Sequence, residues 1–220
     1  MILDQFKIEL INHDNSKQIT EIAKLHLELL PNSKPSKLGL FFLEKFYLNT
    51  LIKYKCINGY SFSIEDKYVG FTLFTKYPNK FIYKGFNSAP IKYIILGLLL
   101  VFTKPLTVYD IFIRGTKKIK KNKNYLNEKF KTGQWLTFAV KEKYLKYISK
   151  DGFRVSHYLV NNMLVWFKSN NYSKIAAAVR KNNLPAILFY KSMGFNVIES
   201  ELVEKEYYFL DINLDNIPDR

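Results

Sequence analysis

The spacing of apolar residues predicts two helices in the first quarter of the chain, preceded by a short strand. Alternation in "FKIELI", residues 6–11, indicates the strand. The segment "NSKQITEIAKLHLELL" then predicts a helix with an N-cap at Ser16 and an end before Pro31. A further helix is predicted from an N-cap at Ser36 into the fifties. The apolar face of the first helix consists of Ile19, Ile22, Leu25 and Leu29.

Alternating apolar and polar positions return after the second helix and predict a β-hairpin. "YSFSIE", residues 60–65, and "YVGFTLFTKY", residues 68–77, flank the turn-forming pair Asp66 and Lys67. Three later segments also have the composition of strands. They are "QWLTFAV" (134–140), "KIAAAVR" (174–180) and "EKEYYFLDI" (204–212).

The C-terminal half alternates strands with helices. Between strands 134–140 and 174–180 lie a loop containing Gly152 and a segment with apolar residues at helical spacing. Strand, helix and strand in this order predict a crossover connection and at least one parallel strand pair, which defines the α/β class. The apolar positions of this helix are Val155, Leu159, Met163 and Trp166 or Phe167.

"RKNNLPAILFYKSMGF", residues 180–195, predicts a helix with both ends marked. Asn183 is the expected N-cap, Pro185 fits the first turn, and Gly194 is placed for a left-handed C-cap. By periodicity alone, Tyr190 is an ordinary core or interface tyrosine that needs one hydrogen-bond partner. The apolar stripe comprises Ala186, Phe189, Tyr190 and Met193.

Composition and charge narrow the class of protein. The 220 residues are 48% apolar and 16% aromatic, enough to build a large core and to argue against disorder. A net charge of +15 suits an anionic partner: nucleic acid, a phosphorylated small molecule or an acidic membrane surface. The charge is dispersed along the chain, however, so a general compositional bias is the favoured explanation. The lysine-rich segment 117–131 is either a solvated face or an anion-binding patch.

Cysteine usage and hydropathy bear on the compartment. Cys56 is the only cysteine, so an internal disulfide is excluded and no metal-ligand motif is visible. A reducing cytoplasmic compartment is therefore expected, without a secretory signal, a transmembrane segment or a metal. The apolar run 93–103 is shorter than the roughly 20 residues that span a bilayer. It predicts a buried helix, or alternatively a contact with a membrane surface or another subunit.

The last predicted strand–helix pair resembles the C-terminal signature of the GNAT superfamily of N-acetyltransferases. The strand 134–140, the loop with Gly152 and the following helix resemble that family's acetyl-coenzyme A motif, and two helices before a hairpin are its usual opening. The matching signature positions are Val179, Asn183, Ala186, Phe189, Tyr190, Gly194 and Phe195.

The resemblance implies a fold and a domain organisation. It implies a mixed, mostly antiparallel sheet, splayed where the strands ending near Val140 and Val179 run parallel, with helices on both faces. One acetyltransferase domain would cover residues 1–220, and residues 77–131 would be an insertion unusual for the family.

The same resemblance implies a binding site for acetyl-coenzyme A as co-substrate. Backbone amides of Phe138, Ala139 and Val140 would bind the pantetheine arm, and Asn183 and Tyr190 would border the coenzyme. The pyrophosphate would lie on the loop and helix N-terminus, where unpaired N–H groups and the helix dipole attract anions. That part of the site comprises Lys150, Asp151, Gly152, Phe153, Arg154 and Val155.

The pyrophosphate loop departs from the family pattern. Ser149 stands where Gln or Arg is usual, Arg154 stands where a second small residue is usual, and the interval from Val140 to Gly152 is longer. Either Arg154 and Lys150 contact phosphate directly, or the loop follows a different path.

Acetyl transfer to an amine needs a proton donor for the leaving thiolate and an acceptor for the amine proton. Tyr190 matches the family's usual acid. Glu142 and Glu28 are candidate bases, His26 is a further one, and relay through water is the alternative. His157 is interpreted as a structural residue.

The sequence therefore predicts an N-acetyltransferase that uses acetyl-coenzyme A and direct attack by a primary amine. A small-molecule acceptor is expected, such as an amino sugar or a sugar nucleotide, and nucleic acid is not. A protein or peptide amine is the alternative acceptor. The rival class is a non-catalytic protein of the same fold that binds an anionic partner. A homodimer and a peripheral membrane contact are among the expected associations.

Overall fold

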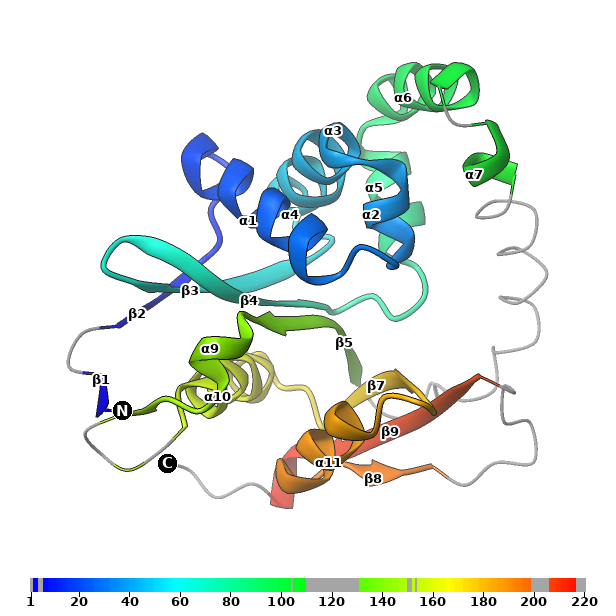
Figure 1. Cartoon of the computed structure of the whole chain (residues 1–220). Coiled ribbons are helices and arrows are strands. Elements are labelled where there is room, and N and C mark those ends of the chain that lie inside the picture. Colours follow the sequence, from blue (N-terminus) through cyan, green and yellow to red (C-terminus); the bar gives the residue numbers. More distant parts are fainter. Residues whose placement is uncertain are drawn as a thin grey trace.

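A seven-stranded sheet organises the molecule (Figure 1). The computed structural model describes residues 2–3, 6–103, 105–109, 131–149, 152, 154–198 and 206–216. The strand order in the sheet is β2-β3-β4-β5-β7-β9-β8. The strands are β2 (Lys7–Leu10), β3 (Asn58–Ile64), β4 (Lys67–Thr75), β5 (Thr132–Val140), β7 (Lys174–Arg180), β8 (Asn196–Val197) and β9 (Tyr207–Asn213). Two further short strands, β1 (Ile2–Leu3) and β6 (Ile148–Ser149), pair in parallel beside this sheet.

β5 and β7 are the only parallel pair in the seven-stranded sheet, and they pair over three residues. The register runs from Thr132 opposite Lys174 to Gln134 opposite Ala176. Beyond Gln134, β5 continues alongside β4 to Val140, while β7 continues alongside β9 to Arg180. The two strands therefore diverge, and the predicted splayed parallel pair in a mostly antiparallel sheet is confirmed.

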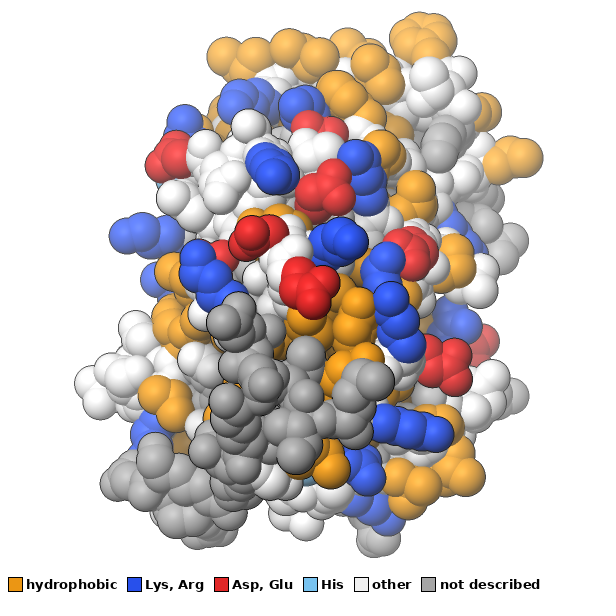
Figure 2. All heavy atoms as spheres, turned by 60° about the vertical axis from the view of Figure 1, so that its left-hand side comes forward, with side chains coloured by type: hydrophobic (Ala, Val, Ile, Leu, Met, Phe, Trp, Pro, Cys, Tyr) orange, Lys and Arg blue, Asp and Glu red, His pale blue; other side chains and the backbone are white. Residues whose placement is uncertain are grey.

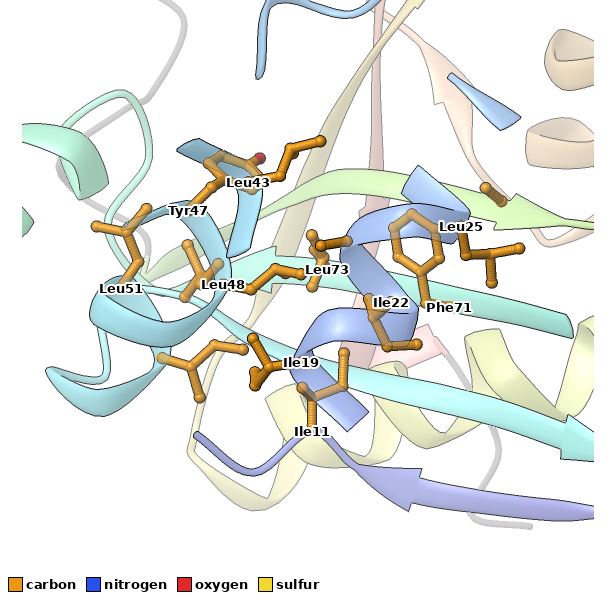
Figure 3. Close-up of a cluster of buried hydrophobic side chains, with 14 of the residues drawn as sticks. Ile11, Ile19, Ile22, Leu25, Leu43, Tyr47, Leu48, Leu51, Phe71 and Leu73 are labelled. Atoms are coloured by element: carbon orange, nitrogen blue, oxygen red, sulfur yellow. The ribbon is translucent and has the colours of Figure 1, made fainter. Parts of the chain in front are cut away.

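One face of the sheet is covered by helices from the N-terminal part of the chain. Ile22 and Leu25 of the first helix lie beside Phe71 of β4, and Leu48 and Leu51 belong to the same buried cluster (Figure 3). The close packing of these side chains excludes water from the middle of the sheet. The elements of this layer are α1 (Ser16–Leu29), α2 (Lys34–Leu38), α3 (Leu40–Phe42), the π-helix η1 (Leu43–Thr50) and α4 (Leu51–Lys53).

The opposite face is covered by α10 (Val155–Ser169) and α11 (Leu184–Ser192), with α9 (Glu142–Leu145) at the end of β5 (Figure 1). Met163 and Phe167 of α10 are fully buried against Ile175 of β7. A side chain at Gly133 would collide with the ring of Phe167, so α10 packs closely where β5 meets β7. Helices on both faces are thus confirmed. A single 3-10 turn, η3 (Leu214–Asn216), follows β9.

The segment between β4 and β5 contributes three helices to the described structure. They are α5 (Phe81–Ser88), α6 (Pro90–Thr103) and α7 (Pro105–Tyr109). The apolar run 93–103 is helical as predicted, but only Leu96 and Leu100 are buried, so the expectation of a buried helix is wrong for most of its residues. No single helix of the described residues is long and apolar enough to cross a membrane; α5 and α6 meet that test only together, across a bend of 110°. The predicted lysine-rich segment 117–131 lies outside the described residues except for Lys131.

Three local predictions were wrong by one to three residues. The N-cap of α1 is Asn15, whose side chain accepts from the N–H of Gln18 at 3.0 Å, because the asparagine precedes Ser16 and reaches the same first turn. The N-cap of α2 is Ser33, and the helix stops at Gly39 before α3 and η1 continue to Thr50, so the predicted single helix is interrupted.

The third correction concerns the hairpin turn. Glu65 and Asp66 are the two turn residues, with φ of 47° and 59°, and Lys67 already pairs with Ile64. Two successive residues with positive φ match the twist of the flanking strands, which places the turn one residue earlier than predicted.

His26 belongs to the core. Its ring is 1% exposed, stacks on Phe71 at 5.4 Å between centroids and lies 3.1 Å from the hydroxyl of Ser36 through Nδ1. Burial lowers the pKa of His26 to about 4. The neutral ring is therefore the stable form inside the protein, which suits a packing role.

This burial predicts a stability loss in mild acid. The unfolded chain binds a proton at His26 near the ordinary pKa of 6.5, and the folded chain only near 4, so stability is full above pH 6.5 and falls toward pH 4. The expected loss in the free energy of unfolding is about 3 kcal/mol by pH 4. Urea unfolding of the protein and of His26→Asn at pH 7, 6, 5 and 4.5 should show a shallower pH dependence in the variant. Equal slopes would contradict the assignment.

Candidate active site

The helix α11 has both of its predicted caps. The side chain of Asn183 accepts from the N–H of Ala186 at 3.2 Å. Gly194 has a φ of +89°, and the N–H of Phe195 donates to the carbonyl of Tyr190 at 3.0 Å, which closes the last turn. Ile187 is the most deeply buried residue of the helix. The cap residues thus fix where Tyr190 stands relative to β7.

Tyr190 lies where β5 and β7 diverge. Its ring meets that of Trp135 at 4.8 Å between centroids, edge to face, and that of Phe195 at 5.4 Å. Trp135 is the first residue of β5 beyond the parallel pairing. The indole N–H of Trp135 donates to the hydroxyl of Thr72 at 2.8 Å and to the carbonyl of Thr137 at 3.1 Å. These bonds hold the surface on which Tyr190 rests.

The Tyr190 hydroxyl carries its proton at neutral pH and can therefore donate it. Burial raises its pKa above the ordinary value of 10. The phenol is therefore protonated at neutral pH. Among the described residues the hydroxyl has no hydrogen-bond partner, so its proton is available to a ligand.

A β-bulge interrupts β5 next to Trp135. Leu73 of β4 pairs with Thr137 and Phe74 pairs with Trp135, which leaves Leu136 without a partner on β4. Bulges of this kind re-aim the side chains and amides on either side and recur beside active sites. Here the bulge coincides with the divergence from β7.

The three residues predicted to bind the pantetheine arm follow the bulge. Phe138, Ala139 and Val140 pair with β4 on one side only, because β7 has left the other edge. Alternate backbone amides along such an edge point away from β4. The Phe138 ring stacks on Phe189 of α11 at 5.0 Å, so α11 lies across this part of β5.

The N-terminus of α10 forms the far border of this region. Arg154 is the N-cap and is exposed, and no side chain of the described residues caps the helix. The first-turn N–H groups of a helix have no intrahelical partner and carry its positive dipole end. Gly152 is exposed, Val155 begins the helix, and Lys150, Asp151 and Phe153 lie outside the described residues.

His157, in the first turn of α10, links the helix to α11. Its ring lies 5.9 Å from that of Phe189. Burial lowers the pKa of His157, and the charge of Arg154 lowers it further. The imidazole is thus kept neutral in contact with an aromatic ring, between the predicted pyrophosphate site and Tyr190's helix.

The two candidate carboxylate bases lie near the end of β5 but apart from Tyr190. Glu28 of α1 forms an ion pair of 3.0 Å with Lys141, the residue that follows β5. Glu142 is exposed in the first turn of α9. The ring contacts of Tyr190 are Trp135, Phe189 and Phe195, so neither carboxylate touches it in the described structure.

Three features of the site were not anticipated from the sequence. The Trp135–Tyr190 contact, the Phe138–Phe189 stack and the bulge at Leu136 all depend on which strands meet. The aromatic residues were visible, but their spacing indicates only a strand and a helix. A tryptophan at the start of a buried strand was the one signal available.

Neither the family models nor the curated protein sequences give a match to this chain. Solved structures do. A probable acetyltransferase from Staphylococcus epidermidis superposes with a TM-score of 0.56 at 14% identity, covering 95% of this chain and 99% of that one. A spermidine N-acetyltransferase chimera that includes Vibrio cholerae sequence gives 0.54 at 13%, covering 96% and 97%.

A third structure is informative because it holds a ligand. The PaiA N-acetyltransferase from Thermoplasma acidophilum, in complex with coenzyme A, gives a TM-score of 0.52 at 10% identity, covering 94% of this chain and 99% of that one. At such identities the similarity establishes the fold. This chain has the fold of GNAT acetyltransferases, as the resemblance predicts.

The surroundings of Tyr190 predict different stabilities for two substitutions. Tyr190→Phe removes a hydroxyl that makes no hydrogen bond among the described residues and should change the free energy of unfolding by less than about 1 kcal/mol. Tyr190→Ala removes the ring from Trp135 and Phe195 and should cost about 3–5 kcal/mol. Urea unfolding measures both. A large loss in Tyr190→Phe would reveal a structural role for the hydroxyl.

Proposed function

We propose that this protein transfers an acetyl group from acetyl-coenzyme A to a primary amine. The observation that carries the proposal is the position of Tyr190. It lies on a capped helix, against Trp135, at the point where β5 and β7 separate in a fold shared with acetyltransferases. We further propose that residues 1–220 act as one acetyltransferase domain in which 77–131 is an insertion.

The coenzyme would lie between β5 and the start of α10. The amides of Phe138, Ala139 and Val140 that point away from β4 can bond the amide groups of a pantetheine arm, as another strand would. The uncapped N-terminus of α10 and the Arg154 guanidinium suit a pyrophosphate. Lys150, Asp151, Gly152, Phe153 and Val155 complete the proposed cradle, with Asn183 at the start of α11.

The reaction has two proton requirements. The neutral amine nitrogen forms a bond to the acetyl carbonyl carbon, and the carbon–sulfur bond breaks. Tyr190 donates its proton to the departing sulfur. The proton lost by the amine passes to water, or through water to Glu142 or Glu28. Direct transfer to either carboxylate is not proposed, because neither one contacts Tyr190, which marks the proposed reaction centre.

The choice of acceptor amine rests on the net charge of the protein rather than on the shape of a pocket. A net charge of +15 favours an acceptor that carries phosphate groups, so we propose an amino sugar in the form of a sugar nucleotide, whose phosphates supply the negative charge. A peptide amine is the competing class. Release of thiol across panels of amino sugars, sugar nucleotides, peptides and polyamines distinguishes them. Highest kcat/KM on neutral peptides would overturn the proposed acceptor.

Coenzyme binding predicts a thermal shift. Acetyl-coenzyme A at ~100 times its Kd should raise the unfolding midpoint by about 5–10 °C. Arg154→Gln should weaken binding about tenfold or more, since it removes a charge-assisted hydrogen bond. Lys168→Gln removes the same charge at the other end of α10 and is the matched control. No shift at millimolar ligand would leave only the non-catalytic class.

Removal of the Tyr190 proton predicts a kinetic defect. Tyr190→Phe should lower kcat about 10²–10⁴-fold, while the Kd for acetyl-coenzyme A stays within about twofold. Tyr172→Phe, which removes a hydroxyl before the start of β7, is the matched control. Unchanged turnover in Tyr190→Phe would remove Tyr190 from the mechanism while leaving coenzyme binding intact.

A further inference from the structure

Helix α6 is apolar on two opposite faces. Tyr93, Leu96 and Leu100 recur at helical spacing and pack against Phe42 and Phe46 of the N-terminal layer. This stripe attaches α6 to the protein. An ordinary surface helix would be polar on the other side.

The outer face of α6 is instead covered with large apolar side chains. Seven of them are exposed, between 44% at Leu99 and 84% at Phe102. Ile91, Ile95, Leu98 and Phe102 follow one another at intervals of four, three and four residues, so they form one continuous stripe opposite the buried one. A contiguous apolar face of this kind marks an interaction surface.

The exposed apolar residues of the described chain are concentrated here. Eleven of the nineteen large exposed hydrophobic residues lie between Ile82 and Leu106, on α5, α6 and α7. α6 lies beyond the N-terminal helices, on the side away from the sheet (Figure 1). In Figure 2 apolar side chains line that top edge, whereas acidic and basic ones mix across the middle of the face. The surface is thus separate from the proposed active site.

The charges near this surface distinguish between a second copy of the chain and a membrane as its occupant. The sequence from Lys67 to Tyr109 contains six lysines and neither Asp nor Glu. Lys80 and Lys84 at the start of α5, and Lys92 in the first turn of α6, are exposed. A symmetric contact between two copies would bring these lysines together without acidic partners from the same segment. Anionic lipid headgroups would attract them.

Length and shape limit how α6 can meet a bilayer. Its 14 residues span about 21 Å, less than the roughly 30 Å hydrocarbon core. α5 turns away from it by 110° and exposes Tyr83 and Phe86, side chains that suit the headgroup region. We propose that α5 and α6 bind the surface of an anionic membrane, with the outer stripe of α6 buried at the boundary between the headgroups and the acyl chains.

Cosedimentation with lipid vesicles tests the proposal. The full-length protein should bind vesicles of phosphatidylcholine with about 30% phosphatidylglycerol, bind phosphatidylcholine alone much more weakly, and dissociate as salt rises. Failure to bind the anionic vesicles, or equal binding to both, would overturn the proposal.

Paired variants locate the surface. Leu98→Glu should weaken vesicle binding about tenfold or more, whereas Val165→Glu, a similarly exposed position on α10, should leave it unchanged. Lys92→Gln should weaken it about fivefold, and Lys17→Gln in the first turn of α1 should not. Equal effects within either pair would contradict the assignment.

Two controls distinguish a loss of membrane binding from a loss of the folded structure or a change of oligomeric state. Leu98→Glu should retain the thermal midpoint and coenzyme response of the parent protein, because its side chain is exposed. Analytical ultracentrifugation should give the same oligomeric state for both. A dimer that Leu98→Glu dissociates, without vesicle binding by the parent, would assign the surface to a second copy instead.

Discussion

The three-residue parallel pairing of β5 with β7 is the constraint on which the rest of the structure depends. Parallel strands require a crossover, and α10 supplies it on the face opposite α1. Gly133 lies within that pairing and leaves room for Phe167 of the crossover helix. Because the pairing ends at Gln134, each strand then follows its antiparallel neighbour, and the open edge of β5 exists only for this reason.

The position of every element of the proposed site depends on the divergence of β5 from β7. Trp135 occupies its apex and is oriented by Thr72 and Thr137. Tyr190 rests on Trp135, and its burial raises the pKa of the hydroxyl, which keeps its proton at neutral pH. The start of α10 lies at the same end of β5, because a crossover helix begins where its first strand ends. The positions of the proposed proton donor, of the open backbone edge and of the proposed pyrophosphate site are therefore consequences of one strand arrangement.

Helix α1 places polar groups in different environments on its inner and outer faces. His26 is a buried ring kept neutral by its surroundings, whereas Glu28, two residues later on the same helix, points outward to Lys141. That separation follows the helical period. It explains why two candidate bases on one helix have opposite environments, and why only the carboxylate is accessible near the end of β5.

The sequence by itself determined the main strands and helices, the α/β class and the caps of α11, since periodicity, Asn183 and Gly194 act locally. The shorter elements β1, β6, β8, α5, α7 and α9 were not predicted. The family resemblance added the splay and singled out Tyr190. Local patterns also misplaced the caps of α1 and α2 and the hairpin turn by one to three residues, because more than one nearby residue could serve in each place. Only the tertiary structure decided that Trp135 supports Tyr190, that β5 bulges at Leu136 and that the outer face of α6 is uncovered. Contacts between residues tens of positions apart depend on strand order and packing, which no local spacing encodes.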